Sequence, residues 1–169
     1  MILIVRTTYR DLGTAKRTFH GVLVLTFGDV TLQFYLASSG DKLSVAWYIV
    51  LERETPGFDH SVNGKAVAKA SAQLDSFAKE KVLPPLMSFF SISPEELAGF
   101  AEDHGVSLEQ SPSEKWFSAD DGLKTVNGLI DGAEKHKLDA RVIADLREFQ
   151  TVLEVAKQHD IGWHLAVDF

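Results

Sequence analysis

Two runs of β-favouring residues separated by only two residues constrain the fold of this 169-residue chain more than any other feature. The runs are Gly21–Phe27 and Val30–Ala37, and Gly28-Asp29 lies between them. Glycine at the first position of a two-residue loop favours a type II′ turn, which closes an antiparallel hairpin. This turn sets the register, because it places Phe27 opposite Val30. One side of the hairpin is then wholly apolar, and the other side is mixed.

A third strand is expected over Leu43–Leu51, after a turn rich in serine and glycine. Its alternation places Phe34 opposite Trp47, because a shift by one residue would bring Ser44 among the large apolar side chains. Met1–Thr8, which is apolar on both faces, is expected to add a further strand. The first third of the chain therefore predicts an antiparallel meander sheet of three to five strands with one apolar face toward helices.

The rest of the chain changes to a helical period, and about four helices are expected. Pro84-Pro85 ends or kinks the first helix, because proline lacks the N–H that the helix needs. The second helix starts at Ser93-Pro94-Glu95-Glu96, where serine at the N-cap and glutamate at N3 form a capping box. Ser118 and Asp139 are expected to cap the third and fourth helices.

The closing segment Ile161–Phe169 alternates again and is expected to form a last strand, with Trp163, Leu165 and Val167 on one face. Strands followed by segregated helices favour an α+β fold with the helices packed mainly on one face of the sheet. No repeat, low-complexity tract or linker divides the chain. We therefore expect a single α+β domain over residues 1–169.

The composition excludes several classes of function. The chain has no cysteine, which rules out disulfides, thiolate nucleophiles and cysteine-based metal sites. A formal net charge of −7 at pH 7 disfavours nucleic acid as a partner, because such a surface repels phosphates. No run approaches the roughly 20 apolar residues of a membrane span, and the N-terminus lacks the features of a signal peptide. A cytoplasmic protein without membrane contact and without a cofactor is expected.

Several short motifs lie in the last two-thirds of the chain, namely Phe58-Asp59-His60, Val62-Asn63-Gly64-Lys65, Pro85-Leu86 with Phe89 and Ser91, Trp116-Phe117, Gly122-Leu123, Thr125-Val126 and Trp163-His164-Leu165-Ala166-Val167-Asp168. Together they resemble motifs of small bacterial proteins of unknown function. The resemblance implies a bacterial, cytoplasmic origin. It carries over no activity and no catalytic residue.

The loop before the first helix is the main candidate for chemistry. Asp59, His60 and Lys65 gather where this loop meets a helix N-terminus, which presents N–H groups to anions. One interpretation is a small enzyme or an anionic-ligand site, with His60 as a general base oriented by Asp59. The other interpretation is structural, with Ser61 or Asn63 capping the helix.

The six histidines do not predict a metal site, because no two of them have the i, i+3 or i, i+4 spacing that helical sites use. His104, His136 and His159 fall near expected helix C-termini, where an imidazolium interacts favourably with the helix dipole. His164 is expected to be a hydrogen-bonded structural residue. Four strand residues, roughly 13 Å, separate it from Asp168 and exclude a catalytic dyad.

The leading hypothesis for function is a non-enzymatic protein-binding module. It would present a mixed sheet face that includes Gln33, Tyr35 and Tyr48, or the loop around Trp116, to another protein. The acidic charge suits a basic partner, such as a toxin that an immunity protein neutralises. Homodimerisation through an exposed strand or through the mixed face is an alternative. The competing hypothesis is the small enzyme or anionic-ligand domain at the loop before the first helix, and the absence of a catalytic motif leans against an enzyme.

Overall fold

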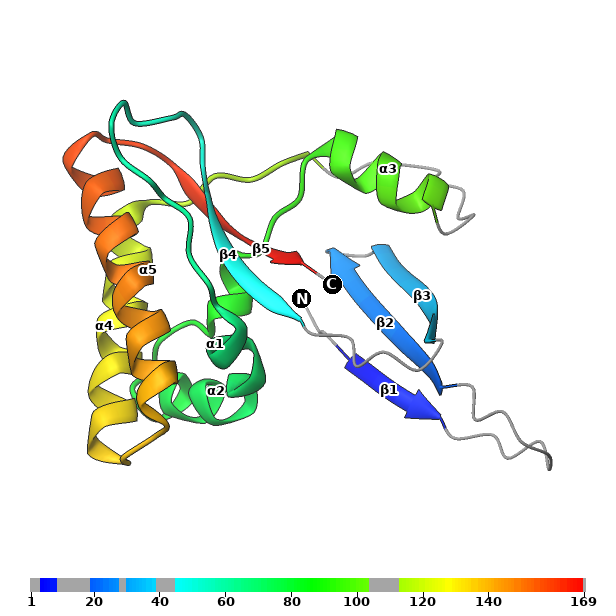
Figure 1. Cartoon of the computed structure of the whole chain (residues 1–169), viewed down its shortest axis with the longest axis horizontal. Coiled ribbons are helices and arrows are strands. Elements are labelled where there is room, and N and C mark those ends of the chain that lie inside the picture. The colour runs from blue at the N-terminus through cyan, green and yellow to red at the C-terminus, as the bar shows by residue number, and fades with distance from the viewer. Residues whose placement is uncertain (1–3, 9–18, 28–29, 39–44, 104–112, 169) are drawn as a thin grey trace. The chain divides into compact units, whose positions relative to one another are not determined.

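In the computed structural model, residues 4–8, 19–27, 30–38, 45–103 and 113–168 are described, and they combine helices with antiparallel sheets (Figure 1). The α+β class is therefore confirmed. The chain divides into two compact units, one with residues 1–43 and 95–112 and the other with residues 44–94 and 113–169. The prediction of a single domain over residues 1–169 stays a prediction.

The first unit contains a three-stranded antiparallel sheet in the order β1-β2-β3. Its elements are β1 (Ile4–Thr8), β2 (Phe19–Phe27), β3 (Val30–Ser38) and most of α3 (Pro94–Asp103). The predicted hairpin register is confirmed, with Phe27 opposite Val30 and Leu25 opposite Leu32. The strand near the N-terminus is confirmed as well, because β1 pairs with β2. The turn at Gly28-Asp29 lies outside the described residues.

The second unit packs helices on a two-stranded antiparallel sheet, β4-β5 (Figure 1). Its elements are β4 (Ala46–Leu51), α1 (Lys65–Lys69), α2 (Ser71–Glu80), the short 3₁₀ helix η1 (Leu86–Phe89), α4 (Ala119–Lys135), α5 (Ala140–Gln158) and β5 (Trp163–Asp168). The long helices α4 and α5 lie side by side along one face of this sheet.

The predicted partner of the third strand was wrong. β4 pairs with β5, so that Trp47 lies opposite Val167 and Ile49 lies opposite Leu165, and Trp47 does not face Phe34. The physical reason is that β5 also presents an apolar side chain at every second position. An alternating pattern sets which face of a strand is buried, but it does not select between two partners of equal pattern. A single meander of three to five strands is therefore not confirmed.

The core of the second unit forms where the inner face of β4-β5 meets the helices. Trp163 is fully buried, and its indole Nε1 donates a hydrogen bond to the Ser118 carbonyl at 3.0 Å. Every residue of the predicted stripe on α5 is buried, namely Val142, Leu146, Phe149, Leu153 and Ala156. Burying one large apolar side chain contributes about 1.5–3 kcal/mol, so this stripe anchors α5.

Local signals placed the starts of α4 and α5 correctly. The Ser118 hydroxyl accepts a hydrogen bond from Asp120 N at 3.2 Å, and the Asp139 carboxylate accepts one from Arg141 N at 2.9 Å. Both caps satisfy N–H groups that the first helical turn leaves without an internal partner.

The first predicted helix is in fact two helices, because the chain breaks at Ala70 between α1 and α2. Val67 of the predicted stripe is buried on α1, and Leu74 and Ala78 are buried on α2. Pro84-Pro85 follow the end of α2, as expected from their effect on helices.

Two chain segments cover the outer edge of β5. Ser91 N donates to the Leu165 carbonyl at 3.1 Å, and Phe117 exchanges two hydrogen bonds with Trp163, at 2.8 and 3.1 Å. Lys115 N in turn donates to the Ser91 hydroxyl at 2.8 Å, which joins the two covering segments. The chain leaves and re-enters the second unit through these segments.

Candidate functional site

Lys65 lines two hollows in the described part of the second unit. The β4 groove, of about 600 Å³, is defined by Tyr48, Val50, His60, Val62, Lys65 and Asp168. The α1–α5 hollow, of about 570 Å³, is defined by Lys65, Lys69, Gln73, Asp139, Arg141 and Asp145. Both volumes lie in the range typical of ligand sites, 300–1,000 Å³.

The β4 groove lies between a strand and the segment that flanks it. Tyr48 and Val50 are two positions apart on β4, so their half-buried side chains share one face of the sheet. The flanking segment runs antiparallel to β4 and meets it at Gly64, whose carbonyl accepts a hydrogen bond from Trp47 N at 3.4 Å. A methyl group on Gly64 would collide with the Trp47 carbonyl, so this close approach requires glycine.

The structure brings two of the three predicted catalytic candidates to this groove. His60 and Lys65 line it, but Asp59 does not. The Asp59 carboxylate instead accepts a hydrogen bond from Ser61 N at 2.9 Å, and hydrogen bonding by Ser61 lowers the pKa of Asp59. Within the described part of the chain, no hydrogen bond joins His60 to a carboxylate. The orienting contact that a general base requires is therefore not formed by Asp59.

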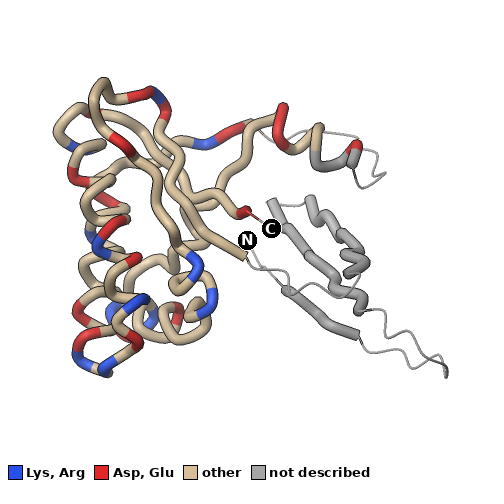
Figure 2. Tube along the Cα trace, in the orientation of Figure 1, with Lys and Arg blue, Asp and Glu red and all other residues tan. Residues whose placement is uncertain are grey.

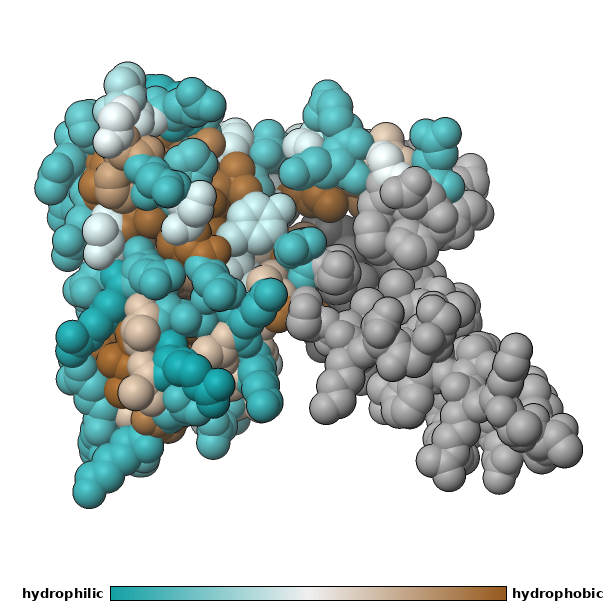
Figure 3. Space-filling model, in the orientation of Figure 1, coloured by the Kyte–Doolittle hydropathy of each residue, from teal (hydrophilic) through white to brown (hydrophobic). Residues whose placement is uncertain are grey.

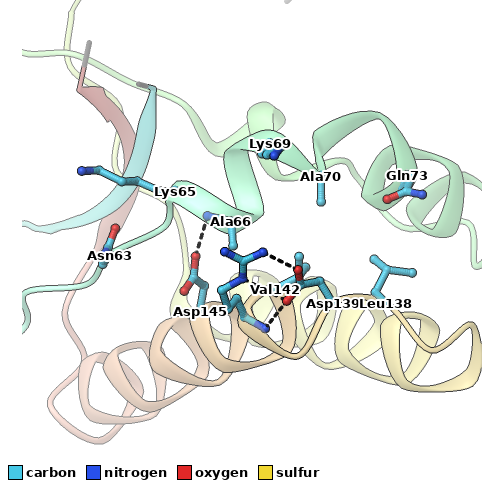
Figure 4. A pocket seen from close by; sticks show the side chains of 11 residues that line it. Asn63, Lys65, Ala66, Lys69, Ala70, Gln73, Leu138, Asp139, Val142 and Asp145 are labelled. Atoms are coloured by element: carbon cyan, nitrogen blue, oxygen red, sulfur yellow. Dashed lines mark hydrogen bonds and ion pairs between the residues drawn. The ribbon is translucent and has the colours of Figure 1, made fainter. Parts of the chain in front are cut away.

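The α1–α5 hollow contains a cap that the sequence did not reveal. The Asp145 carboxylate on α5 accepts hydrogen bonds from Ala66 N at 2.9 Å and Val67 N at 3.4 Å, in the first turn of α1 (Figure 4). Burial raises the pKa of Asp145, and this effect outweighs the two hydrogen bonds, which lower it. The expected capping by Ser61 or Asn63 was wrong, because no local side chain caps α1.

The strongest cation of this hollow already has an anionic partner. Arg141 donates two hydrogen bonds to the Asp139 carboxylate, from Nε at 3.1 Å and from a terminal nitrogen at 2.6 Å. This bidentate pair lowers the pKa of Asp139 to about 2, chiefly through the side-chain hydrogen bond from Arg141. An anion entering the hollow would have to compete with Asp139 for Arg141.

The predicted binding residues do not share one sheet. Gln33 and Tyr35 lie on β3, whereas Tyr48 lies on β4, which pairs with β5. The side chains of Gln33 and Tyr35 are outside the described part of the structure. The common face that was expected to join them with Tyr48 is therefore not a face of a single sheet, and their part in binding stays a prediction.

Trp116 packs on a buried histidine. Its ring and that of His164 have centroids 4.8 Å apart at 48°. His164 is fully buried, with Nε2 3.0 Å from a Glu114 carboxylate oxygen and Nδ1 3.2 Å from the Leu165 carbonyl. A carbonyl only accepts hydrogen bonds, so Nδ1 is the donor in its contact with Leu165. His164 is thus a hydrogen-bonded structural residue, as predicted.

The described residues hold no metal-binding cluster and no membrane-spanning helix. No three histidine, aspartate or glutamate side chains there are placed to hold a metal ion. No helix in this part of the chain is both long and apolar enough to cross a membrane. Comparison of the whole sequence and fold with protein families, curated proteins and solved structures finds no match.

Proposed function

We propose that this chain is a non-enzymatic protein-binding module and that the β4 groove holds the partner. The observation that carries the proposal is the combination of an apolar floor with charged groups at one end. Tyr48 and Val50 form the floor, and Lys65 and Asp168 lie near the end where Gly64 meets β4. Tyrosine is enriched where binding energy concentrates, and a few charged groups around an apolar centre provide orientation.

The surface around the groove supports the same proposal. Figure 3 shows apolar atoms reaching the surface over β4 and beside it, within surroundings that are mostly hydrophilic. Figure 2 shows that acidic and basic residues are interspersed along α4 and α5, so these helices present no large area of one sign. An apolar strip bordered by polar residues is a common mark of an interaction site. The net charge of −7 favours a basic partner.

The geometry gives less support to an enzyme. His60 and Lys65 line the groove, but the carboxylate of Asp59 is engaged by Ser61. The enzyme hypothesis relied on Asp59 to orient His60, and Asp59 does not make this contact. We therefore propose that His60 and Lys65 contact the partner and take no part in catalysis.

Site-directed photo-crosslinking tests the proposal. A benzophenone amino acid at position 48 should capture one defined partner from a lysate of the source organism, and the same label at Glu154, exposed on α5, should not. The substitution Tyr48→Ala should then weaken the isolated complex at least tenfold, because it removes the aromatic floor of the groove. Equal capture at both positions would refute the proposal, and capture of a second copy of the chain would point to homodimerisation.

A small anionic ligand is the second candidate function. It is favoured by one observation, namely that Lys65 and Lys69 line the α1–α5 hollow together with Arg141. Titration with inorganic phosphate should then change the amide chemical shifts of α1. The substitution Lys69→Gln should abolish these changes. A response that is unchanged in Lys69→Gln would exclude the hollow as an anion site.

A further inference from the structure

We infer that the β4 groove takes the C-terminal segment of a partner polypeptide, which pairs as an extended strand with the edge of β4 and places its terminal carboxylate at Lys65. This inference rests on the proposed function and specifies the chemistry of the partner. Three features of the described residues carry it, namely the direction of the main-chain groups of β4, their lack of partners, and the closed end of the groove.

The main chain of β4 directs two residues toward the groove. In an antiparallel pair, successive residues turn both N–H and C=O alternately toward and away from the neighbouring strand. Trp47 N donates to Gly64 and therefore faces away from β5, whereas Glu52 N donates to Gly162 on the β5 side at 2.9 Å. By this alternation the N–H and C=O groups of Ile49 and Leu51 also face away from β5.

These four main-chain groups have no hydrogen-bond partner within the described part of the chain. Ile49 and Leu51 are only 2% and 9% exposed, so water reaches them poorly. Buried N–H and C=O groups are paired in the great majority of native structures, because each unpaired group costs free energy. Both residues border the β4 groove. An added strand supplies alternating donors and acceptors at the spacing that this edge requires.

The side chains on the floor of the groove suit an extended peptide. If one peptide residue pairs with Ile49, its two neighbours lie beside Tyr48 and Val50 on the outer face of the sheet. Aromatic and β-branched side chains are favoured at such cross-strand positions. The partner segment therefore carries apolar residues at alternating positions near its end.

One end of the groove is closed. Gly64 already occupies the edge position next to Trp47, so an added strand must stop there. In the antiparallel orientation, the end that meets Gly64 is the C-terminus of the peptide. Lys65 follows Gly64, and Figure 4 shows its side chain extending away from Asp139 toward the β4 side. A carboxylate at this end would meet the Lys65 ammonium group, and Asp168 nearby would oppose it.

The experiment uses the full chain and a library of ten-residue peptides with random sequences and free C-termini. Binding of the selected peptides is measured by fluorescence anisotropy. We expect amidation of the peptide C-terminus, or Lys65→Gln in the protein, to weaken binding at least tenfold. Asp168→Asn should strengthen it several-fold. Lys69→Gln, which affects only the α1–α5 hollow, is the matched control and should change nothing.

A scan of backbone N-methylation along the peptide reports on strand pairing. Methylation should abolish binding at the residues that pair with Ile49 and Leu51 and should have little effect between them, which gives a period of two. Equal binding of acid and amide peptides, or loss without this period, overturns the inference. So does a library that yields no binder sensitive to Tyr48→Ala. Partner capture at position 48 would then still support the proposed function.

The flanking segment could itself fill the edge of β4 in solution. Hydrogen exchange of the free and the peptide-bound chain distinguishes this case. Our inference expects exchange at the amides of Ile49 and Leu51 to slow at least tenfold when a peptide binds. Exchange at both amides that a bound peptide leaves unchanged would show that the edge is already paired, and it would overturn the inference.

Discussion

Replacement of Gly122 by alanine tests the packing that holds the second unit together. Gly122 is buried in the first turn of α4. A methyl group there would lie 2.5 Å from Cζ2 and 2.7 Å from Cε2 of Trp163. Carbon atoms in favourable contact are about 3.5–4.0 Å apart, so the methyl group would overlap the indole ring. Trp163 cannot easily yield, because it is fully buried and its Nε1 donates to the Ser118 carbonyl.

The expected magnitude follows from two opposing effects. Alanine is favoured over glycine within a helix by about 0.5–1 kcal/mol. Overpacking of a well-filled core costs about 1–3 kcal/mol. The collision of the Gly122→Ala methyl group with a ring that is held on all sides belongs to the upper part of that range. We therefore expect a net loss of about 1–2 kcal/mol in the free energy of unfolding.

Urea unfolding, followed by the helical circular dichroism signal, measures this loss. Gly132→Ala on the same helix is the matched control, because its methyl group would lie 3.0 Å from the ring of Phe77, which is half-buried and able to shift. Its stability should stay within about 0.5 kcal/mol of the parent. In a Trp163→Phe background the collision is relieved, so Gly122→Ala should become neutral or stabilising. A Gly122→Ala protein as stable as the parent, or a double-mutant cycle without coupling, would refute this account of the packing.

Three further predictions concern single polar or strained residues. Asp145→Ala should cost about 1 kcal/mol of unfolding free energy by removing the cap of α1, whereas Asp145→Asn keeps an acceptor and should cost less. Burial raises the pKa of Asp145 in the folded state above its value in the unfolded chain, which is about 3.9. The parent should therefore lose stability relative to Asp145→Asn as the pH rises above that unfolded-state pKa. Urea unfolding at acidic and at neutral pH measures this loss. Val82 is 92% exposed with φ of 55°, so Val82→Gly should raise the free energy of unfolding by about 1 kcal/mol, and an unchanged melting temperature would contradict this. Glu114→Leu should lower the free energy of unfolding by about 1–3 kcal/mol, because it leaves Nε2 of His164 unpaired. The amide of Glu114→Gln can instead donate to Nε2. Nitrogen NMR of the Glu114→Gln protein should then detect a neutral His164 ring that is protonated at Nδ1.

Local signals account for the parts of the fold that the sequence predicted. The hairpin register depended on a two-residue connection, which leaves little freedom to the strands on either side. The caps at Ser118 and Asp139 depend on groups within two residues of each other. In each case the deciding interaction lies within one turn of the chain.

The parts that were missed depend on residues far apart in the sequence. Trp47 could have paired with either of two strands of similar pattern, and the choice of β5 involves residues more than 100 positions away. The carboxylate that caps α1 comes from Asp145, 79 positions after Ala66. Glu114 lies 50 positions before His164. A residue pattern indicates whether a position is buried or exposed, but it does not identify a partner that is distant in the sequence. The sequence could therefore suggest His60 and Lys65 as candidate site residues, but it could not predict which residues surround them.

The hydrogen bonds along the outer edge of β5 affect which changes of sequence this protein can accept during evolution. Ser91 and Lys115 are hydrogen-bonded to each other, and Ser91 and Phe117 are hydrogen-bonded to β5. The chain between Ser91 and Lys115 therefore leaves the second unit and returns to it at the same place. A segment whose two ends are held together can be lengthened, trimmed or exchanged while the framework that anchors it keeps its own contacts. Insertions between these two fixed ends should therefore leave the hydrogen bonds of β5 intact, provided that they spare Glu114 and its contact with His164.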